Sequence, residues 1–188
     1  MKQIDFEHKA ITEIETDSEV KTCMEGKIGI GDKHCKLAVY SANRPPLEEY
    51  LERESLIPAA EEELAMIARE TGNHWRKIIN IYAKLAYMLN TQQFSTWQCY
   101  RDTFLLTRKS QQALLFNNSI VTSKTETISI ICGKTHAMSL LDNKTLNWID
   151  DNFAINPTLR VIVTPYFDYR QLSNIKLEKL VEIINSLN

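Results

Sequence analysis

The chain has 188 residues, 44% of them hydrophobic and 24% charged, a composition typical of one globular domain. Its formal net charge of −2 argues against a protein that coats DNA by bulk charge. No apolar stretch reaches the roughly 20 residues that cross a bilayer, and the acidic start lacks the apolar core of a signal peptide. The sequence therefore predicts a cytoplasmic protein with no membrane partner.

The charges are distributed unevenly along the chain. Residues 1–70 hold nine Lys or Arg against sixteen Asp or Glu, a net charge of −7, whereas residues 71–148 hold nine against three, a net charge of +6. Two interpretations stay open. Either the basic middle presents a positive face suited to an anionic ligand or nucleic acid, or the two parts neutralise each other in the folded protein.

The four cysteines are Cys23, Cys35, Cys99 and Cys132, and no two of them form a CxxC pair. Spacings this wide favour neither a disulfide framework nor a structural zinc site. We predict reduced thiols, with Cys132 as a small core residue. The sequence predicts no metal and no cofactor.

The first 35 residues are predicted to form an irregular or hairpin extension, because they are polar, weakly periodic and end in a glycine-containing stretch, GKIGIGDKHC. Residues 36–188 are predicted to form a single α/β domain. It opens with the strand KLAVYSA at residues 36–42, which two consecutive prolines end. A short helix over 47–54 follows, and then a helix after Pro58 whose first turn holds three glutamates, 61–63.

The strongest periodicity begins at Asn73, which we expect to be a helix N-cap. An apolar stripe then runs from Trp75 to Leu89 at helical spacing. The first turn of this helix carries three basic residues, His74, Arg76 and Lys77. Cations at this end oppose the helix dipole, so they indicate an anion site there, unless solvent simply screens them.

Residues 97–109 read as a short helix or loop, and three more apolar runs follow as predicted strands, at 113–117, 127–133 and 160–165. None of these runs shows the polar alternation of a half-exposed strand, which favours a parallel sheet covered on both faces. Helices are predicted from Lys134, from Thr145 and from Asn174, the last with Ile175 among its inward residues and Ser173 or Asn174 as its cap. The fold class predicted is a three-layer α/β/α sandwich with a central, mostly parallel sheet of about four strands.

Ligands of open parallel sheets bind outside the carboxyl ends of the strands. Polar residues follow all four predicted strands at this edge: Asn43 and Arg44, Asn117 and Asn118, Lys134 and His136, and Tyr166, Asp168, Tyr169 and Arg170. Asp168 and His136 are candidates for an acid and base pair, with a plain turn as the alternative role of Asp168. P-loop, serine-hydrolase and zinc-hydrolase motifs are absent from the sequence.

Three stretches resemble the uracil-DNA glycosylase superfamily: SANRPP after the first strand, IICGKTHA, and VIVTPYFDYRQLSN around the last strand. The resemblance covers residues 36–188 and implies that superfamily's fold. The catalytic motifs are not retained, because Arg44 stands where the family has the Asp or Asn that orients water, and Tyr166 stands where it has a histidine. An arginine stays protonated and cannot act as the base, whereas a tyrosine can still donate to a developing negative charge.

Our leading hypothesis is a divergent member of that superfamily that binds nucleic acid or a nucleotide, with glycosylase catalysis lost or altered. The candidate catalytic residues are Asn43, His136, Tyr166 and Asp168, and the candidate ligand and phosphate-binding residues are Arg44, His74, Arg76, Lys134, Tyr169 and Arg170. Two alternatives stay open. One is an enzyme for a small anionic substrate, and the other is a non-catalytic interaction or homo-oligomerisation module that uses Trp97, Trp148, Phe153 and Tyr169 as exposed aromatics.

Overall fold

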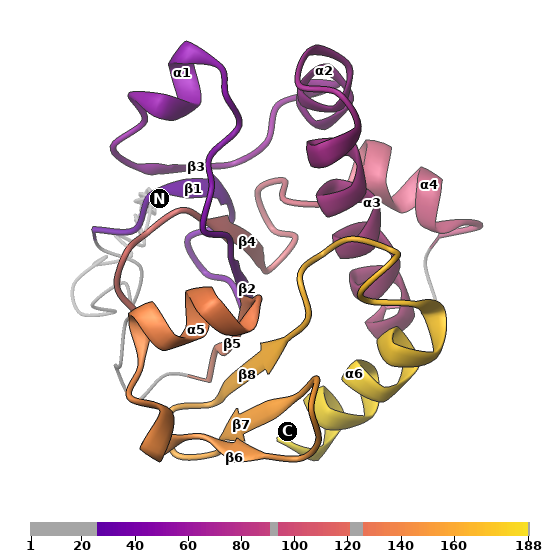
Figure 1. Cartoon of the computed structure of the whole chain (residues 1–188). Coiled ribbons are helices and arrows are strands. Elements are labelled where there is room, and N and C mark those ends of the chain that lie inside the picture. The colour runs from indigo at the N-terminus through magenta and orange to yellow at the C-terminus, as the bar shows by residue number, and fades with distance from the viewer. Residues whose placement is uncertain (1–25, 91–93, 121–125, 188) are drawn as a thin grey trace, which may run out of the picture.

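A computed structural model describes residues 26–90, 94–120 and 126–187. Its centre is one eight-stranded mixed sheet with the strand order β3-β1-β4-β2-β5-β8-β7-β6 (Figure 1). The strands are β1 (Gly29–Gly31), β2 (Leu37–Tyr40), β3 (Leu56–Ile57), β4 (Gln112–Leu115), β5 (Ile128–Cys132), β6 (Asn147–Trp148), β7 (Ala154–Asn156) and β8 (Val161–Thr164).

The four strands predicted from sequence form the parallel middle of this sheet, in the order β4-β2-β5-β8. Every residue in these four strands is buried, as a sheet covered on both faces requires. The α/β class is therefore confirmed. The prediction of a sheet of about four strands was wrong, because short strands extend the sheet at both edges. Three of the seven strand pairings are antiparallel.

The added edge strands are short. Residues 29–31, which the sequence placed in an N-terminal extension, form β1 and pair with both β3 and β4. Gly29 permits this pairing, because a Cβ there would lie 2.1 Å from the carbonyl oxygen of Leu114. The sheet thus begins before the predicted boundary at residue 36, and the rest of the predicted extension, residues 1–25, lies outside the described residues.

Six α-helices are found among the described residues: α1 (Glu48–Leu51), α2 (Glu63–Glu70), α3 (Asn73–Leu89), α4 (Trp97–Thr103), α5 (Lys134–Leu140) and α6 (Asn174–Ser186). The apolar sides of α2, α3 and α6 join Val39, Ile130 and Ile162 in the larger core, on one face of the sheet. On the opposite face Ala137 of α5 packs with Tyr40 and Val163 in a smaller core. In the described part of the chain, no helix is long and apolar enough to cross a membrane.

The α3 stripe is as predicted, with buried side chains from Trp75 to Ala86. Its N-cap is Gly72 rather than Asn73, which is the first helical residue. The glutamates 61–63 do not share a first turn either, because α2 begins only at Glu63 and Glu62 precedes it with a φ of 60°. The predicted helix from Thr145 was wrong, since this segment ends a 3₁₀ turn (Asn143–Thr145) and continues into β6.

Two single-residue predictions were also wrong. Ile175 is 78% exposed, whereas we had placed it on the inward face of α6, and Ile183 is buried on that face instead. Phe153, expected among the exposed aromatics, is only 1% exposed and belongs to the larger core. The prediction for Cys132 is confirmed, because its side chain is buried at the end of β5.

Candidate functional site

The loop that follows β8 approaches the first half of α3 at the carboxyl edge of the parallel strands (Figure 1). This contact is fixed by an ion pair of 2.8 Å between Lys77 Nζ on the helix and Asp168 Oδ2 in the loop. Both groups are partly buried. The second carboxylate oxygen, Oδ1, accepts the backbone N–H of Arg170 at 3.0 Å.

These contacts stabilise the ionised form of Asp168. The backbone N–H of Arg170 is the largest cause that lowers the pKa of this carboxyl group, and the Lys77 ammonium adds to it. The carboxylate therefore serves as the anchor that holds the loop on α3. No hydrogen bond among the described residues joins Asp168 to His136, the partner proposed from sequence.

One group of predicted site residues meets at Tyr166. The Tyr166 hydroxyl lies 3.0 Å from His74 Nε2, and the two rings are stacked at a centroid distance of 5.6 Å. Burial raises the pKa of the Tyr166 phenol, and hydrogen bonds with the side chains of Asn43 and Ser41 oppose that rise. We call Ser41, Asn43, His74 and Tyr166 the Tyr166 cluster. At neutral pH its phenol is protonated and able to donate a hydrogen bond.

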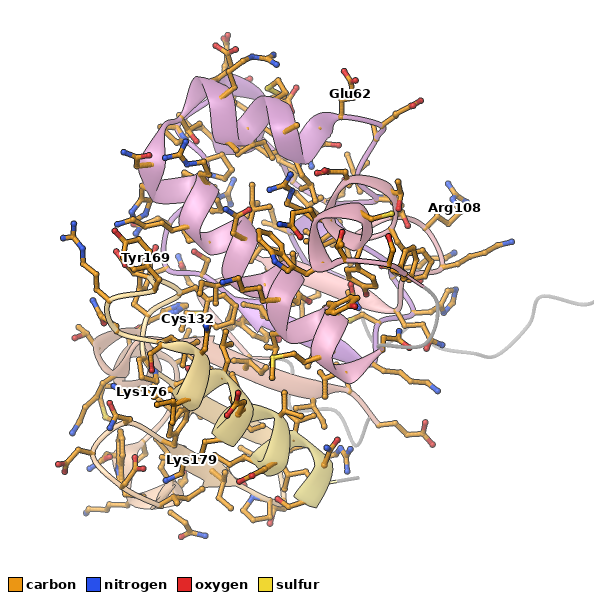
Figure 2. All side chains as sticks on the ribbon, turned by 90° about the vertical axis from the view of Figure 1, so that its right-hand side faces the viewer. Glu62, Arg108, Cys132, Tyr169, Lys176 and Lys179 are labelled. Carbon is orange, nitrogen blue, oxygen red and sulfur yellow. The ribbon has the colours of Figure 1, made fainter. Side chains whose placement is uncertain are left out.

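A second group lies along the outer side of α3, beside the cluster. A pocket of about 420 Å³ is lined there by Asn73, Arg76, Lys77, Asn80, Ile81, Lys84, Trp97, Tyr169 and Arg170, and we call it the α3 groove. Its polar helix residues recur every three or four positions, opposite the buried stripe of α3. Figure 2 shows Tyr169 projecting at this side of the helix.

The α3 groove combines cations with aromatic rings. The ammonium of Lys84 lies 5.4 Å and the guanidinium of Arg101 5.6 Å from the centroid of the Trp97 ring. At the other end, the Lys77 ammonium lies 4.9 Å from the Tyr169 ring centroid. Of the lining residues that the structure describes, four are basic and none is acidic.

The charged groups of Arg44 and Lys134 make their contacts with residues outside both groups. The Nη1 atom of Arg44 lies within hydrogen-bonding distance of three backbone carbonyls at and beyond the end of α1, those of Tyr50, Leu51 and Arg53. Lys134 is exposed, and its ammonium lies 4.3 Å from the ring centroid of Trp148.

His136 is half-buried in the first turn of α5. Burial lowers the pKa of its imidazole, and a hydrogen bond to the backbone of Tyr40 opposes this shift. Its Nδ1 atom is buried and has no hydrogen-bond partner within the part of the chain that the structure describes. At neutral pH the ring is therefore uncharged.

Sequence reasoning missed three polar or aromatic residues of the groove: Asn80 and Lys84 were not singled out, and Trp97 was considered only as a contact for another protein. A signal for the first two was present in the sequence, because residues 73, 76, 77, 80 and 84 follow the helical spacing of one polar face. The contribution of Trp97 depends on how α4 packs on α3, and no periodicity reveals that packing.

A family model described as a family of unknown function, DUF6942, matches residues 28–185. No curated protein and no solved structure matches the chain. In the described residues, no group of three or more His, Cys, Asp or Glu side chains could hold a metal ion.

Proposed function

The chain belongs to this family of unknown function, DUF6942, and we propose from its geometry that it binds single-stranded nucleic acid in the α3 groove. The observation that carries the proposal is the joint presence, among the described lining residues, of four basic residues and two aromatic rings with no acidic residue. Cations that track a phosphate backbone, interleaved with rings on which bases stack, are the common features of single-strand binding sites.

Three of the groove cations have charge available for phosphate. No ion pair in the described part of the chain involves Arg76, Lys84 or Arg170. Arg76 donates to the neutral Asn73 side chain, which orients its guanidinium without cancelling its charge. Lys77 differs from these three, because its charge is already matched by Asp168.

The aromatic residues supply the second part of the proposed interaction. Tyr169 is 56% exposed, so part of its surface is open to a base. Stacking of a base on an aromatic side chain contributes roughly 1–3 kcal/mol and does not depend strongly on the base. The groove should therefore bind single strands with little sequence preference.

We also infer that the chain is a divergent relative of the uracil-DNA glycosylase superfamily. Support comes from the four strands of the resemblance, which lie adjacent and parallel, and from its first and last loops, whose residues Asn43 and Tyr166 are in contact. Base excision is not part of the proposal. Arg44, at the position of the family's water-orienting residue, is a permanent cation that donates to backbone carbonyls.

The two alternatives are less well supported. An enzyme for a small anionic substrate should hold His136 and Asp168 together, but Asp168 is bound to Lys77. An interaction module was expected to expose four aromatics, and one of them, Phe153, lies in the core. The α3 groove, by contrast, uses two of the same aromatics together with the basic residues.

The proposal is tested by fluorescence anisotropy with a labelled single-stranded oligonucleotide at several salt concentrations. Three phosphate contacts at about 0.7 counterions each give an expected slope of about −2 in a plot of log affinity against log salt concentration. Lys84→Gln should reduce the magnitude of that slope by about 0.7. Lys144→Gln removes the same charge at an exposed position outside the groove and should leave the slope unchanged.

A Trp97→Leu variant tests the stacking part, with an expected loss of affinity of about tenfold. The proposal is wrong if the oligonucleotide fails to bind at low salt, or if Lys84→Gln and Lys144→Gln weaken binding equally. A uracil-containing strand should remain intact at its glycosidic bonds. Release of uracil would contradict the non-catalytic part.

A further inference from the structure

A second basic pocket lies near the amino ends of β2 and β4, where no function has been assigned above. It has a volume of about 570 Å³ and is lined by Asp32, Lys33, His34, Leu56, Pro58, Arg108, Lys109 and Gln111. We call it the Arg108 pocket. Figure 2 shows Arg108 and Tyr169 on opposite sides of the molecule, so this pocket is separate from the α3 groove.

Asp32 builds the framework of the pocket. Its side chain is 4% exposed, and its two oxygens accept backbone N–H groups of His34 at 2.9 Å and Gln111 at 3.1 Å. This one carboxylate thereby ties the turn after β1 to the segment that leads into β4. The pocket walls are held in place from both sides before any ligand binds.

The segment that carries Arg108 has an unusual backbone. Leu106, Lys109 and Gln111 have φ values of 61°, 77° and 58°, in the left-handed region that residues with a Cβ rarely adopt. The segment keeps this conformation because it is tied at several points, among them a bond of 2.9 Å from Ala59 N to the Leu106 carbonyl. Strained residues that persist under such constraint concentrate at binding sites.

Among the described residues, the pocket is lined by three basic side chains, Lys33, Arg108 and Lys109, and by a single carboxylate whose oxygens are already bonded. Among the described residues, no ion pair involves any of the three. Leu56 and Pro58 add apolar surface between them. The cations favour a doubly charged group such as phosphate, and the apolar residues favour a hydrophobic body attached to it.

We propose that the Arg108 pocket is a binding site for a small phosphate monoester with an apolar or aromatic body. The phosphate lies against Arg108, Lys109 and Lys33, and the apolar body covers Leu56 and Pro58. The pocket volume falls within the usual range for small-molecule sites, about 300–1,000 Å³. This function is independent of nucleic-acid binding in the α3 groove.

Phenyl phosphate, inorganic phosphate and the labelled oligonucleotide are the probes. Phenyl phosphate should bind the full chain in calorimetry and should shift the amide resonances of Lys33, Leu56 and Gln111 in NMR spectra. Inorganic phosphate should bind at least about tenfold more weakly, because it lacks the apolar body. The oligonucleotide reports whether the α3 groove remains intact.

The test variant is Arg108→Gln combined with Lys109→Asn, since asparagine tolerates the left-handed conformation at position 109. We expect it to weaken phenyl phosphate binding about tenfold and to leave oligonucleotide affinity unchanged. Lys33→Gln lies outside the strained segment and is a second, independent test variant. It should also weaken the binding of phenyl phosphate. Lys84→Gln in the α3 groove is the matched control and should affect only the oligonucleotide.

The proposal would be overturned by equal affinity for phenyl phosphate and inorganic phosphate, by phenyl phosphate shifts confined to α3, or by undiminished binding in both pocket variants. Loss of oligonucleotide affinity in the Arg108 and Lys109 variant would likewise overturn it, because the pocket would then belong to the nucleic-acid surface. If the oligonucleotide never binds but phenyl phosphate does, only the proposed function of the α3 groove is lost.

Discussion

Replacing Arg44 by methionine should destabilise the fold without changing the salt dependence of oligonucleotide binding. Methionine keeps most of the apolar stem of arginine and removes the donors. In the native chain Arg44 Nη1 lies 3.1, 2.8 and 3.0 Å from the carbonyl oxygens of Tyr50, Leu51 and Arg53. The carbonyls of Tyr50 and Leu51 belong to the end of α1, and that of Arg53 lies just beyond it. This helix has one turn, which backbone hydrogen bonds alone would not stabilise.

The expected loss of unfolding free energy is about 3 kcal/mol. One guanidinium nitrogen has two hydrogens, so it satisfies two of the three carbonyls at a time. A hydrogen bond from a charged donor contributes about 1.5–3 kcal/mol net, and the lower value applies because the site is partly exposed to solvent. Two bonds at the lower value give the stated sum.

Urea unfolding, monitored by tryptophan fluorescence, measures this change in unfolding free energy. The slope of the unfolding free energy against urea concentration should be the same in both proteins. The matched control is Arg69→Met, since the Arg69 side chain is 70% exposed and its ion pair among the described residues is with its neighbour Glu70. It should cost less than about 0.5 kcal/mol. If Arg44→Met keeps its stability but shows a smaller salt slope for the oligonucleotide, Arg44 binds phosphate and our structural interpretation is wrong.

Three further outcomes are expected. The folded protein lowers the pKa of Asp168, so the ionised carboxylate stabilises the fold fully above the unfolded-state pKa of about 3.9. This stabilisation is lost as the pH falls through the lower folded-state pKa. Asp168→Asn should therefore lose less stability on acidification than the native chain, as measured by acid unfolding. Gly29→Ala should destabilise by about 2–3 kcal/mol, visible as a lower melting temperature, because the new Cβ would meet the Leu114 carbonyl at 2.1 Å; an unchanged melting temperature would mean that β1 does not pair as described. Burial raises the pKa of the Cys132 thiol, so a thiol reagent should label Cys99 in the folded protein and Cys132 only after urea is added, which peptide mass spectrometry distinguishes.

The centre of the fold could be predicted because its elements carry strong local patterns. The parallel strands are continuous apolar runs, and α3 has a long stripe at helical spacing. The edge strands β3, β6 and β7 have two or three residues each, too few for any periodicity to show. Their pairing is decided by neighbouring strands, so tertiary contacts override the local preferences of a segment such as 145–152.

The candidate site could be predicted only in its location. Chain topology dictates that residues after parallel strands meet at one edge, and Asn43 and Tyr166 do so. The direction of each side chain is set by packing instead. Arg44, next to Asn43, turns to the end of α1, and Lys134 lies on the ring of Trp148. The position of a residue at a strand end therefore predicts roughly where it lies in the fold, but not which groups its side chain contacts.

The uneven charge along the sequence can be compared with the ion pairs of the described residues. Both basic sites draw mainly on residues 71–148: Arg76, Lys77 and Lys84 line the α3 groove, and Arg108 and Lys109 line the second pocket. Within the described residues, no ion pair joins a carboxylate of residues 26–70 to a cation of residues 71–148. Within the described residues, ion pairs therefore do not neutralise the acidic first part of the chain against the basic middle part. At 0.1 M salt, solvent-exposed charges more than about 10 Å apart are largely screened from each other. An anion that approaches either pocket therefore interacts with these local cations more than with the net charge of −2.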